Sequence, residues 1–363
     1  MKRHGYLYDK VADKENLRQA IMRAAKDKKD RDEVKKVLKD IPLHVDLLHE
    51  ILTTKNYQPG RLKEKTIREG AQQKERKVTK IQFFPDQIVH WAIVLVLQPI
   101  IMRSAYTYSC GSMPGRGPHR GKRFVERWVR TDKRNTKHCA KMDITKFYPS
   151  LTNEFLKQLV RRRIKDPDLL WLLDMIIDTH KQGAPIGYLT SQWLANLALQ
   201  RLDYIIKQDL QATYYIRYMD DMVIFGASKR KLHKAISEIR KYLQTLGLQI
   251  KHTWQVFRID CRALDFMGFR FYRHKTILRK SLMLRITRRV RKIYRRGKAS
   301  FRDAAAVISY MGWLKHAQAY TVYKKHVRPY LSIAWLKELI RRYHREELRK
   351  NDYCAIRKRI QTA

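Results

Sequence analysis

The chain has 363 residues, of which 79 are Lys or Arg and 34 are Asp or Glu, giving a formal net charge of +45 at pH 7. A hydrophobic content of 44% excludes a disordered chain, and the length is ample for a buried core. The positive excess is larger than solubility requires and predicts a polyanionic partner, with nucleic acid as the first choice. A membrane-surface protein is the competing interpretation, but the sequence shows no convincing amphipathic or lipidated anchor.

Targeting signals and cysteines point to the cell interior. The opening sequence MKRHGYLYDK lacks the apolar core of a signal peptide. The apolar run Ile88–Met102 is shorter than a membrane span and predicts a buried helix. The four cysteines are widely spaced without a C-x-x-C pair, so we expect neither a zinc site nor a disulfide framework. These features favour a reducing, cytoplasmic location.

Hydrophobic periodicity and turn residues predict the elements in chain order. Residues 1–60 predict polar helices, with the charged run 26–40 as a solvated face or connection. A basic turn then leads to a strand-like segment with Val78 and Ile81, followed by the apolar helix. The further expected elements are a Gly/Pro-rich loop at 110–121, a helix at 121–130, a strand ending at 143, helices at 168–180 and 189–206, a hairpin at 217–226, a helix at 229–247, strand-like segments at 248–257 and 263–272, and basic helices from 273 on.

Three acids occupy strand ends or bends in this pattern. Asp143 ends one predicted strand, and Asp220 and Asp221 lie at the tip of the predicted hairpin. If these strands are neighbours, the carboxylates converge, and oxygen-only ligands of this kind suit Mg²⁺. Two such ions roughly 3.5–4 Å apart can activate an attacking oxygen and stabilise a leaving one in phosphoryl transfer. A simple acidic turn is the alternative, but the apolar flanks and the third acid favour a metal site.

The motifs around these acids resemble the reverse transcriptases. YMDD at Tyr218–Asp221, KMDITKFYPSL at 141–151, GAPIGYLTSQ at 183–192 and LDFMGFRFY at 264–272 follow the order of that family, which covers about residues 10–330. The resemblance implies an α+β right-hand polymerase with fingers, an antiparallel palm sheet and a helical thumb. It implies an RNA-directed DNA polymerase, a nucleotidyltransferase that extends a primer 3′-OH with dNTPs. Two Mg²⁺ ions are its expected cofactors, with Mn²⁺ as a substitute.

The resemblance also divides the chain and assigns roles to residues. The expected parts are an N-terminal helical extension (1–60), fingers with the start of the palm (61–137), the palm with embedded fingers helices (138–272), and a basic thumb with a C-terminal tail (273–363). It makes Asp143 and Asp220 metal ligands and Asp221 the supporting catalytic acid. Tyr148 is where the family closes its pocket against a ribose 2′-OH, with core packing as the other interpretation.

Other expected contacts concern nucleotide and nucleic acid. The segment KERKVTKIQFF resembles the fingertip of the family, where basic residues meet the triphosphate. Lys74, Arg76 and Lys77 are the candidates for that contact, and a solvated basic turn is the strong alternative. Lys251 either reaches the leaving pyrophosphate or is exposed. Ile186 and Gln192 lie in GAPIGYLTSQ, which resembles the block that packs beneath template and incoming nucleotide. An isoleucine cannot hydrogen-bond the nucleotide, which would weaken discrimination against wrong nucleotides, and an apolar packing role is the other interpretation of Ile186. Contacts with template or primer are also expected at Tyr218 and Met219 in YMDD and at Arg116 and Arg120 in the Gly/Pro-rich loop. Gly268 is a further candidate, because LDFMGFRFY resembles the primer-grip hairpin of the family.

A strongly basic segment, the basic arm, follows LDFMGFRFY. Residues 273–298 contain twelve Lys or Arg and no acid, so this segment is a candidate for tracking phosphates along a duplex. Leu282, Ile286, Val290 and Ile293 have the spacing of one helix face. The opposite face carries Arg285, Arg289, Lys292 and Arg296. A membrane-surface helix is the alternative interpretation of the same pattern.

The Ser-Gln ending of GAPIGYLTSQ and the apolar Ile186 resemble reverse transcriptases of diversity-generating retroelements, which copy a template RNA with errors at adenines. This subtype implies a small helical accessory protein beside the template RNA, the RNA/DNA duplex and dNTPs. The loop SCGSMPGRGPHRG departs from that pattern and leaves open a prokaryotic antiviral-defence reverse transcriptase paired with its own noncoding RNA. A basic RNA-binding scaffold with a vestigial polymerase site is the alternative from another class.

Overall fold

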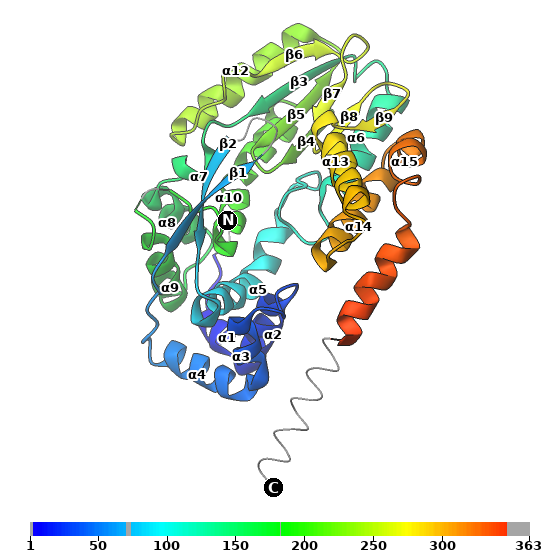
Figure 1. Cartoon of the computed structure of the whole chain (residues 1–363). Helices are drawn as coiled ribbons and strands as arrows, with labels where there is room; N and C mark the ends of the chain where they lie inside the picture. The colour runs from blue at the N-terminus through cyan, green and yellow to red at the C-terminus, as the bar shows by residue number, and fades with distance from the viewer. Residues whose placement is uncertain (1–2, 70–73, 182, 347–363) are drawn as a thin grey trace. The chain divides into compact units, whose positions relative to one another are not determined.

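The computed structural model describes residues 3–69, 74–181 and 183–346, and these form two compact units (Figure 1). Unit 1 holds the chain up to Gly121 together with Asp132–Arg258. Unit 2 holds Lys122–Thr131 and the described residues from Ile259 onward. The second unit therefore starts before the 273 boundary that the sequence suggests for a thumb.

Unit 1 joins many helices to two antiparallel sheets. Its helices are α1 (Tyr8–Ala12), α2 (Lys14–Ala25), α3 (Asp32–Lys39), α4 (Ile41–Thr53), η1 (Phe83–Gln87), α5 (Ile88–Arg103), α7 (Phe147–Ser150), α8 (Asn153–Arg161), α9 (Pro167–Asp178), α10 (Leu189–Ala198), α11 (Gln200–Tyr204), η2 (Ile205–Asp209) and α12 (Lys229–Thr245). Its strands are β1 (Lys63–Glu69), β2 (Lys74–Lys80), β3 (His138–Asp143), β4 (Tyr214–Tyr218), β5 (Asp221–Gly226) and β6 (Gln255–Arg258). Helix α6 (Pro118–Thr131) runs from unit 1 into unit 2.

The larger sheet of unit 1 has the strand order β4-β5-β3-β6, and each pair is antiparallel. The four middle residues of β5 are buried, as expected for a strand covered on both faces. Helix α12 packs on β3, β5 and β6, and its buried stripe runs from Leu232 to Leu243. The strand predicted over 248–257 is shorter than expected, because a turn after Lys251 delays β6 until Gln255.

Helix α5 is the apolar centre of the helical part of unit 1. It packs against α1, α2 and α10, which confirms the buried helix expected from the sequence. The segment Phe83–Arg103, which includes η1, is long and apolar enough to cross a membrane by length and composition alone, but its backbone is non-helical at Phe84 and α5 itself has only 16 residues. Its buried contacts are those of a core helix, and residues such as Ile88, Ala92 and Ile93 are fully enclosed.

A β-hairpin projects from the core as a separate two-stranded sheet of β1 and β2 (Figure 1). The residues between the two strands, 70–73, lie outside the described residues. Near its base, the Thr79 amide donates a hydrogen bond of 2.8 Å to the Ile186 carbonyl. The hairpin is therefore attached to the GAPIGY loop, and Gly187 makes this contact possible. A side chain at Gly187 would place its Cβ 2.2 Å from the Thr79 carbonyl oxygen.

Replacing Gly187 by alanine is expected to lower the free energy of unfolding by about 1–3 kcal/mol, because the residue has φ +122° and its Cβ would overlap Thr79. Urea unfolding of the full chain measures this loss. The matched control is Gly247→Ala, where φ is +69° but no atom lies within 4 Å of the new Cβ. Equal losses in both variants would show that backbone strain alone, and not the contact with the hairpin, sets the cost.

Unit 2 combines a small antiparallel sheet with helices. The strands β7 (Leu264–Phe266), β8 (Phe269–Phe271) and β9 (Thr276–Leu278) pair in sequence order. The helices are α13 (Lys280–Arg296), α14 (Phe301–Lys315) and α15 (Tyr320–His326), and residues 333–346 are also helical. The expectation of helix from residue 273 onward was wrong at its start, since β9 precedes α13. The predicted hairpin at 264–272 is confirmed.

Candidate active site at the acid turn

The register of the sheet brings two of the predicted acids together. Asp143 is the last residue of β3 and pairs directly with Asp221, the first residue of β5. Residues directly opposite one another in an antiparallel pair project to the same face, and like charges in such positions are destabilising. The strands of the sheet therefore place two carboxylates side by side at one end.

The third acid lies in the tight connection between β4 and β5. Tyr218 pairs with Asp221, so Met219 and Asp220 form the two-residue loop of a hairpin. The predicted hairpin is confirmed, with Asp221 starting the strand instead of lying in the tip. Met219 has φ +55°, a left-handed conformation that non-glycine residues adopt rarely. We call the residues Tyr218–Asp221 the acid turn.

Asp220 lies close enough to Asp143 for the two carboxyl groups to interact. Burial raises the pKa of Asp220, the charge and contact of Asp143 raise it further, and Lys251 acts in the opposite direction, with the result near 6. A proton or a cation must therefore offset the repulsion between these two carboxylates.

Two lysines lie beside the acids. Lys251 forms an ion pair with Asp143 Oδ2, and its amide donates a 2.8 Å hydrogen bond to the Asp143 carbonyl. Lys141 Nζ lies 3.8 Å from Asp221 Oδ2. The sequence had left Lys251 between a pyrophosphate contact and an exposed position, and the structure places it against the carboxylate. Lys141 was missed, although its position two residues before Asp143 on the same strand face was a readable signal.

The acids fit a hard divalent cation. Asp143 Oδ1 is buried and accepts no hydrogen bond from the described residues, although Oδ2 of the same carboxylate pairs with Lys251, so Oδ1 is open to a ligand. Carboxylate oxygens are the ligands that Mg²⁺ prefers, and Asp143 and Asp220 would hold it between them. However, within residues 3–69, 74–181 and 183–346 no group of three or more His, Cys, Asp or Glu side chains is arranged to hold a metal ion. The complete three-acid centre remains a prediction.

The expected nucleotide pocket is linked to the acid turn through Tyr148. Burial raises the pKa of the Tyr148 hydroxyl, Asp220 and Tyr218 add to this, and Arg76 opposes it. Tyr148 thus lies within electrostatic reach of the acid and of the β2 strand. Its carbonyl accepts a 2.9 Å hydrogen bond from Ala184, which fixes the start of the loop that carries Ile186.

The other predicted nucleotide contacts are spread over the same unit. Ile186 and Gln192 are half-buried, Gln192 on α10. Arg76 and Lys77 are exposed on β2, and Lys77 Nζ lies 3.9 Å from Glu64 of β1. The backbone of Lys74 begins β2, but its side chain lies outside the described residues. Nothing in these positions singles out one triphosphate ligand.

Several predicted nucleic-acid contacts have structural partners. Arg116 donates a 2.8 Å hydrogen bond to the Tyr106 carbonyl, and burial lowers its pKa. Arg120 is half-buried. Gly268 in unit 2 has φ +86°, and a Cβ there would lie 2.9 Å from the Trp313 ring, so packing explains this glycine.

The basic arm is helix α13, and its apolar stripe is confirmed. Ile286, Val290 and Ile293 are buried, whereas Leu282 is half-buried. On the basic face, Arg285, Lys292 and Arg296 are exposed. Arg289 lies 2.7 Å and Arg296 3.6 Å from Asp303 of α14, so the charges of both are partly neutralised within the unit.

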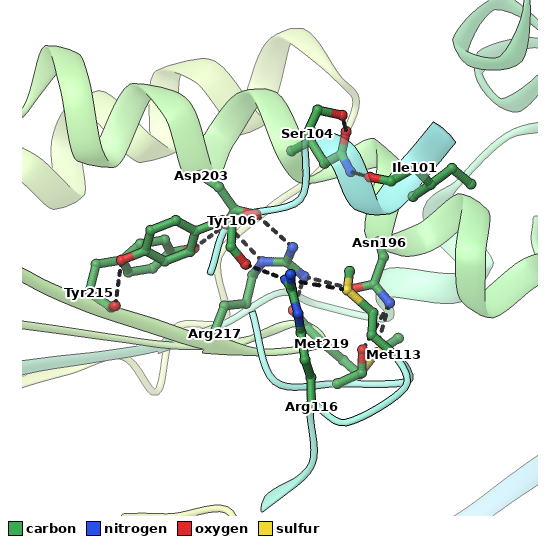
Figure 2. Close-up of polar contacts among 12 residues, drawn as sticks. Ile101, Ser104, Tyr106, Met113, Arg116, Asn196, Asp203, Tyr215, Arg217 and Met219 are labelled. Atoms are coloured by element: carbon green, nitrogen blue, oxygen red, sulfur yellow. Dashed lines mark hydrogen bonds and ion pairs between the residues drawn. The ribbon is translucent and has the colours of Figure 1, made fainter. Parts of the chain in front are cut away.

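Sequence reasoning also missed a buried polar cluster beneath the acid turn, which Figure 2 shows in close-up. Arg217 of β4 is fully buried and pairs with Asp203 of α11, while Asn196 of α10 contacts the same guanidinium. The available signal was polar residues inside the apolar helical pattern of 189–206. Their shared partner could not be read from that pattern.

A sequence model described as "Reverse transcriptase (RNA-dependent DNA polymerase)" matches residues 65–271, more than half of the chain. The chain therefore belongs to the reverse transcriptase family. It is similar to the retron Ec73 reverse transcriptase of Escherichia coli, with 28% identity over 140 residues, which span 35% of this chain and 44% of the relative. Among solved structures, it aligns with apo telomerase from Candida tropicalis at 13% identity and a TM-score of 0.43, over 60% of this chain and 48% of that chain.

Proposed function

We propose that the chain is an RNA-directed DNA polymerase in which a primer 3′-OH attacks a dNTP and pyrophosphate leaves. The observation that carries this proposal is the approach of Asp143 and Asp220 at the acid turn, inside a sequence region that matches the family. Asp143 and Asp220 would hold Mg²⁺, with Asp221 as the supporting acid. When bound, the ions would lower the barrier to phosphoryl transfer by stabilising charge on the attacking and leaving oxygens.

The parts of the chain take polymerase roles within this proposal. The sheet of β3, β4 and β5 serves as the palm, the β1–β2 hairpin belongs to the fingers, and α13 and α14 belong to the thumb. Residues 1–60 form the N-terminal extension, and the protein works in the cytoplasm of its host. Support comes from the exposed cations Arg285, Lys292 and Arg296 on α13, which suit contacts with duplex phosphates.

Residues around the acids would prepare the substrates. Lys251 pairs with Asp143 in the structure and would contact phosphate oxygens of the substrate if that carboxylate held a cation. Tyr148, which lies within electrostatic reach of Asp220, would exclude a ribose 2′-OH with its ring. Exposed Arg76 and Lys77 on β2 would contact the triphosphate.

Replacing Tyr148 by alanine is expected to raise the use of ribonucleotides relative to dNTPs by at least about tenfold, because the ring that excludes the 2′-OH is gone. The ratio of kcat/KM for rGTP and dGTP in primer extension measures this change. Tyr148→Phe is the matched control, since it keeps the ring and should keep the discrimination. If alanine and phenylalanine give the same ratio, Tyr148 only packs the loop at Ala184.

Two biological roles remain as proposals. Mutagenic copying in a diversity-generating retroelement is supported by the Ser-Gln block with Ile186, which would come with an accessory protein. An antiviral-defence enzyme paired with its own noncoding RNA is supported by the divergent loop at 109–121 and is compatible with the similarity to a retron enzyme. Both roles require the same polymerase chemistry.

Primer extension on a mixed-sequence RNA with Mg²⁺, followed by sequencing of the cDNA, tests the function. The control is the double variant Asp220→Asn, Asp221→Asn. Polymerase activity predicts cDNA from the wild type alone. Errors concentrated opposite template adenines favour the retroelement role, and accurate or repetitive cDNA favours the defence role. RNA binding without cDNA from the wild type would instead identify a scaffold.

A further inference from the structure

Arg217 is a buried cation directly beneath the acid turn. Its side chain has 0% exposure, and two of its nitrogens bind the Asp203 carboxylate, with Nε 2.8 Å from Oδ1 and Nη2 2.7 Å from Oδ2. The Tyr215 hydroxyl donates a further hydrogen bond of 2.7 Å to Asp203 (Figure 2). This bidentate arrangement fixes the plane of the guanidinium group.

The third nitrogen of Arg217 is directed at the acid turn itself. Nη1 donates to the Met219 carbonyl at 3.0 Å and to Asn196 Oδ1 at 3.2 Å. Met219 is the left-handed residue of the turn, and its carbonyl belongs to the peptide group that joins it to Asp220. A donor held in place at this carbonyl therefore constrains the orientation of the peptide before the acid.

Asn196 connects the acid turn to the loop segment at Gly111. Its Nδ2 donates to the Gly111 carbonyl at 3.0 Å and lies 3.7 Å from Met219 Sδ. Gly111 is in close contact with the turn, since a Cβ there would lie 2.7 Å from the Met219 amide nitrogen. The backbone of the same segment is bound to β4, because Cys110 donates to the Arg217 carbonyl at 2.7 Å.

A buried ion pair is a costly way to hold a strand against a helix, because apolar residues of similar size do so as well or better. What an apolar pair cannot do is donate a hydrogen bond to the Met219 carbonyl. We propose that Arg217, clamped by Asp203 and Asn196, is a positioning residue that holds the acid turn in the conformation that presents Asp220 to its cation. This inference rests on the proposed polymerase function of the turn.

The decisive variant removes the charges without leaving either one unpaired. Arg217→Met combined with Asp203→Leu is expected to keep much of the stability of the fold but to lose the donor to Met219. We expect kcat for primer extension to fall by about 10- to 100-fold, because small misplacement of a reacting group has effects of this size. Mn²⁺ affinity of the full chain without nucleic acid, measured by calorimetry, should weaken in parallel.

A matched pair of single variants separates positioning from loss of packing. Asn196→Ala removes a buried amide that contacts the acid turn. Gln200→Ala removes a buried amide that instead binds the Ile101 carbonyl at 2.9 Å and accepts from Ser104 at 3.0 Å. Both should lower Tm similarly, but only Asn196→Ala should weaken Mn²⁺ binding and lower kcat.

The outcomes distinguish the positioning role from the polymerase function. If the double variant is folded and extends primers and binds Mn²⁺ like the wild type, the positioning role is refuted while the polymerase function stands. The same holds if Asn196→Ala and Gln200→Ala lose activity equally. If the wild type neither makes cDNA nor binds Mn²⁺, the polymerase function fails and the positioning role fails with it.

Discussion

Replacing Asp220 by asparagine is expected to reduce primer extension by roughly a thousandfold while leaving the protein at least as stable. A bound cation stabilises the transition state by several kcal/mol, and about 1.4 kcal/mol corresponds to a factor of ten in rate. In the folded chain, burial and Asp143 raise the pKa of Asp220 above that of a free aspartate, so the ionised form present at pH 7 opposes folding. A neutral asparagine removes this repulsion.

Single-turnover extension rates and thermal unfolding in EDTA together test this prediction. Asp178→Asn is the matched control, because that carboxylate is 52% exposed in an ion pair with Lys157 and such pairs contribute about 0–1 kcal/mol. The control should keep its rate. A marked fall in Tm for Asp220→Asn would contradict the prediction, because it would mean that the ionised Asp220 carboxylate stabilises the acid turn.

Replacing Asp203 by alanine is expected to lower the free energy of unfolding by about 3–5 kcal/mol, because the fully buried Arg217 would lose its counter-charge. Tyr215 would lose the acceptor of its hydroxyl hydrogen bond in the same variant. Equilibrium urea unfolding measures the loss. The double variant Asp203→Leu, Arg217→Met should cost far less, since no charge stays buried alone. A single-variant loss below about 1 kcal/mol would show that water or a structural shift relieves the charge.

The local pattern of the chain was sufficient to predict the acid turn. Strong apolar runs on both sides of Asp220 and Asp221 identify a hairpin, and the strand that ends at Asp143 has the same signature. Their pairing followed only from assuming that the strands are neighbours, which the register of β3 and β5 confirms. Family resemblance supplied the roles, which the geometry alone does not assign.

The rest depends on contacts between residues far apart in the sequence. Strand β1 was missed because KEKTIRE holds a single apolar residue, Ile67, so no alternation marks it. Arg217 and Asp203 are separated by an irregular connection, and nothing local shows that a strand residue will bind a helix residue. Lys251 was ambiguous for the same reason, since its ion pair with Asp143 depends on a partner 108 positions away.

The segment Tyr108–Cys110 has a consequence for how this protein meets others. β4 is an outer strand of its sheet, and such strands readily add a strand from a neighbouring chain. Here the Arg217 amide donates to the Tyr108 carbonyl at 3.1 Å, and the Arg217 carbonyl accepts a hydrogen bond from the Cys110 amide. These groups are thereby closed to intermolecular strand exchange. The edge of β4 is therefore covered at Arg217 by a segment of the same chain, which is one way in which proteins limit the addition of a foreign strand.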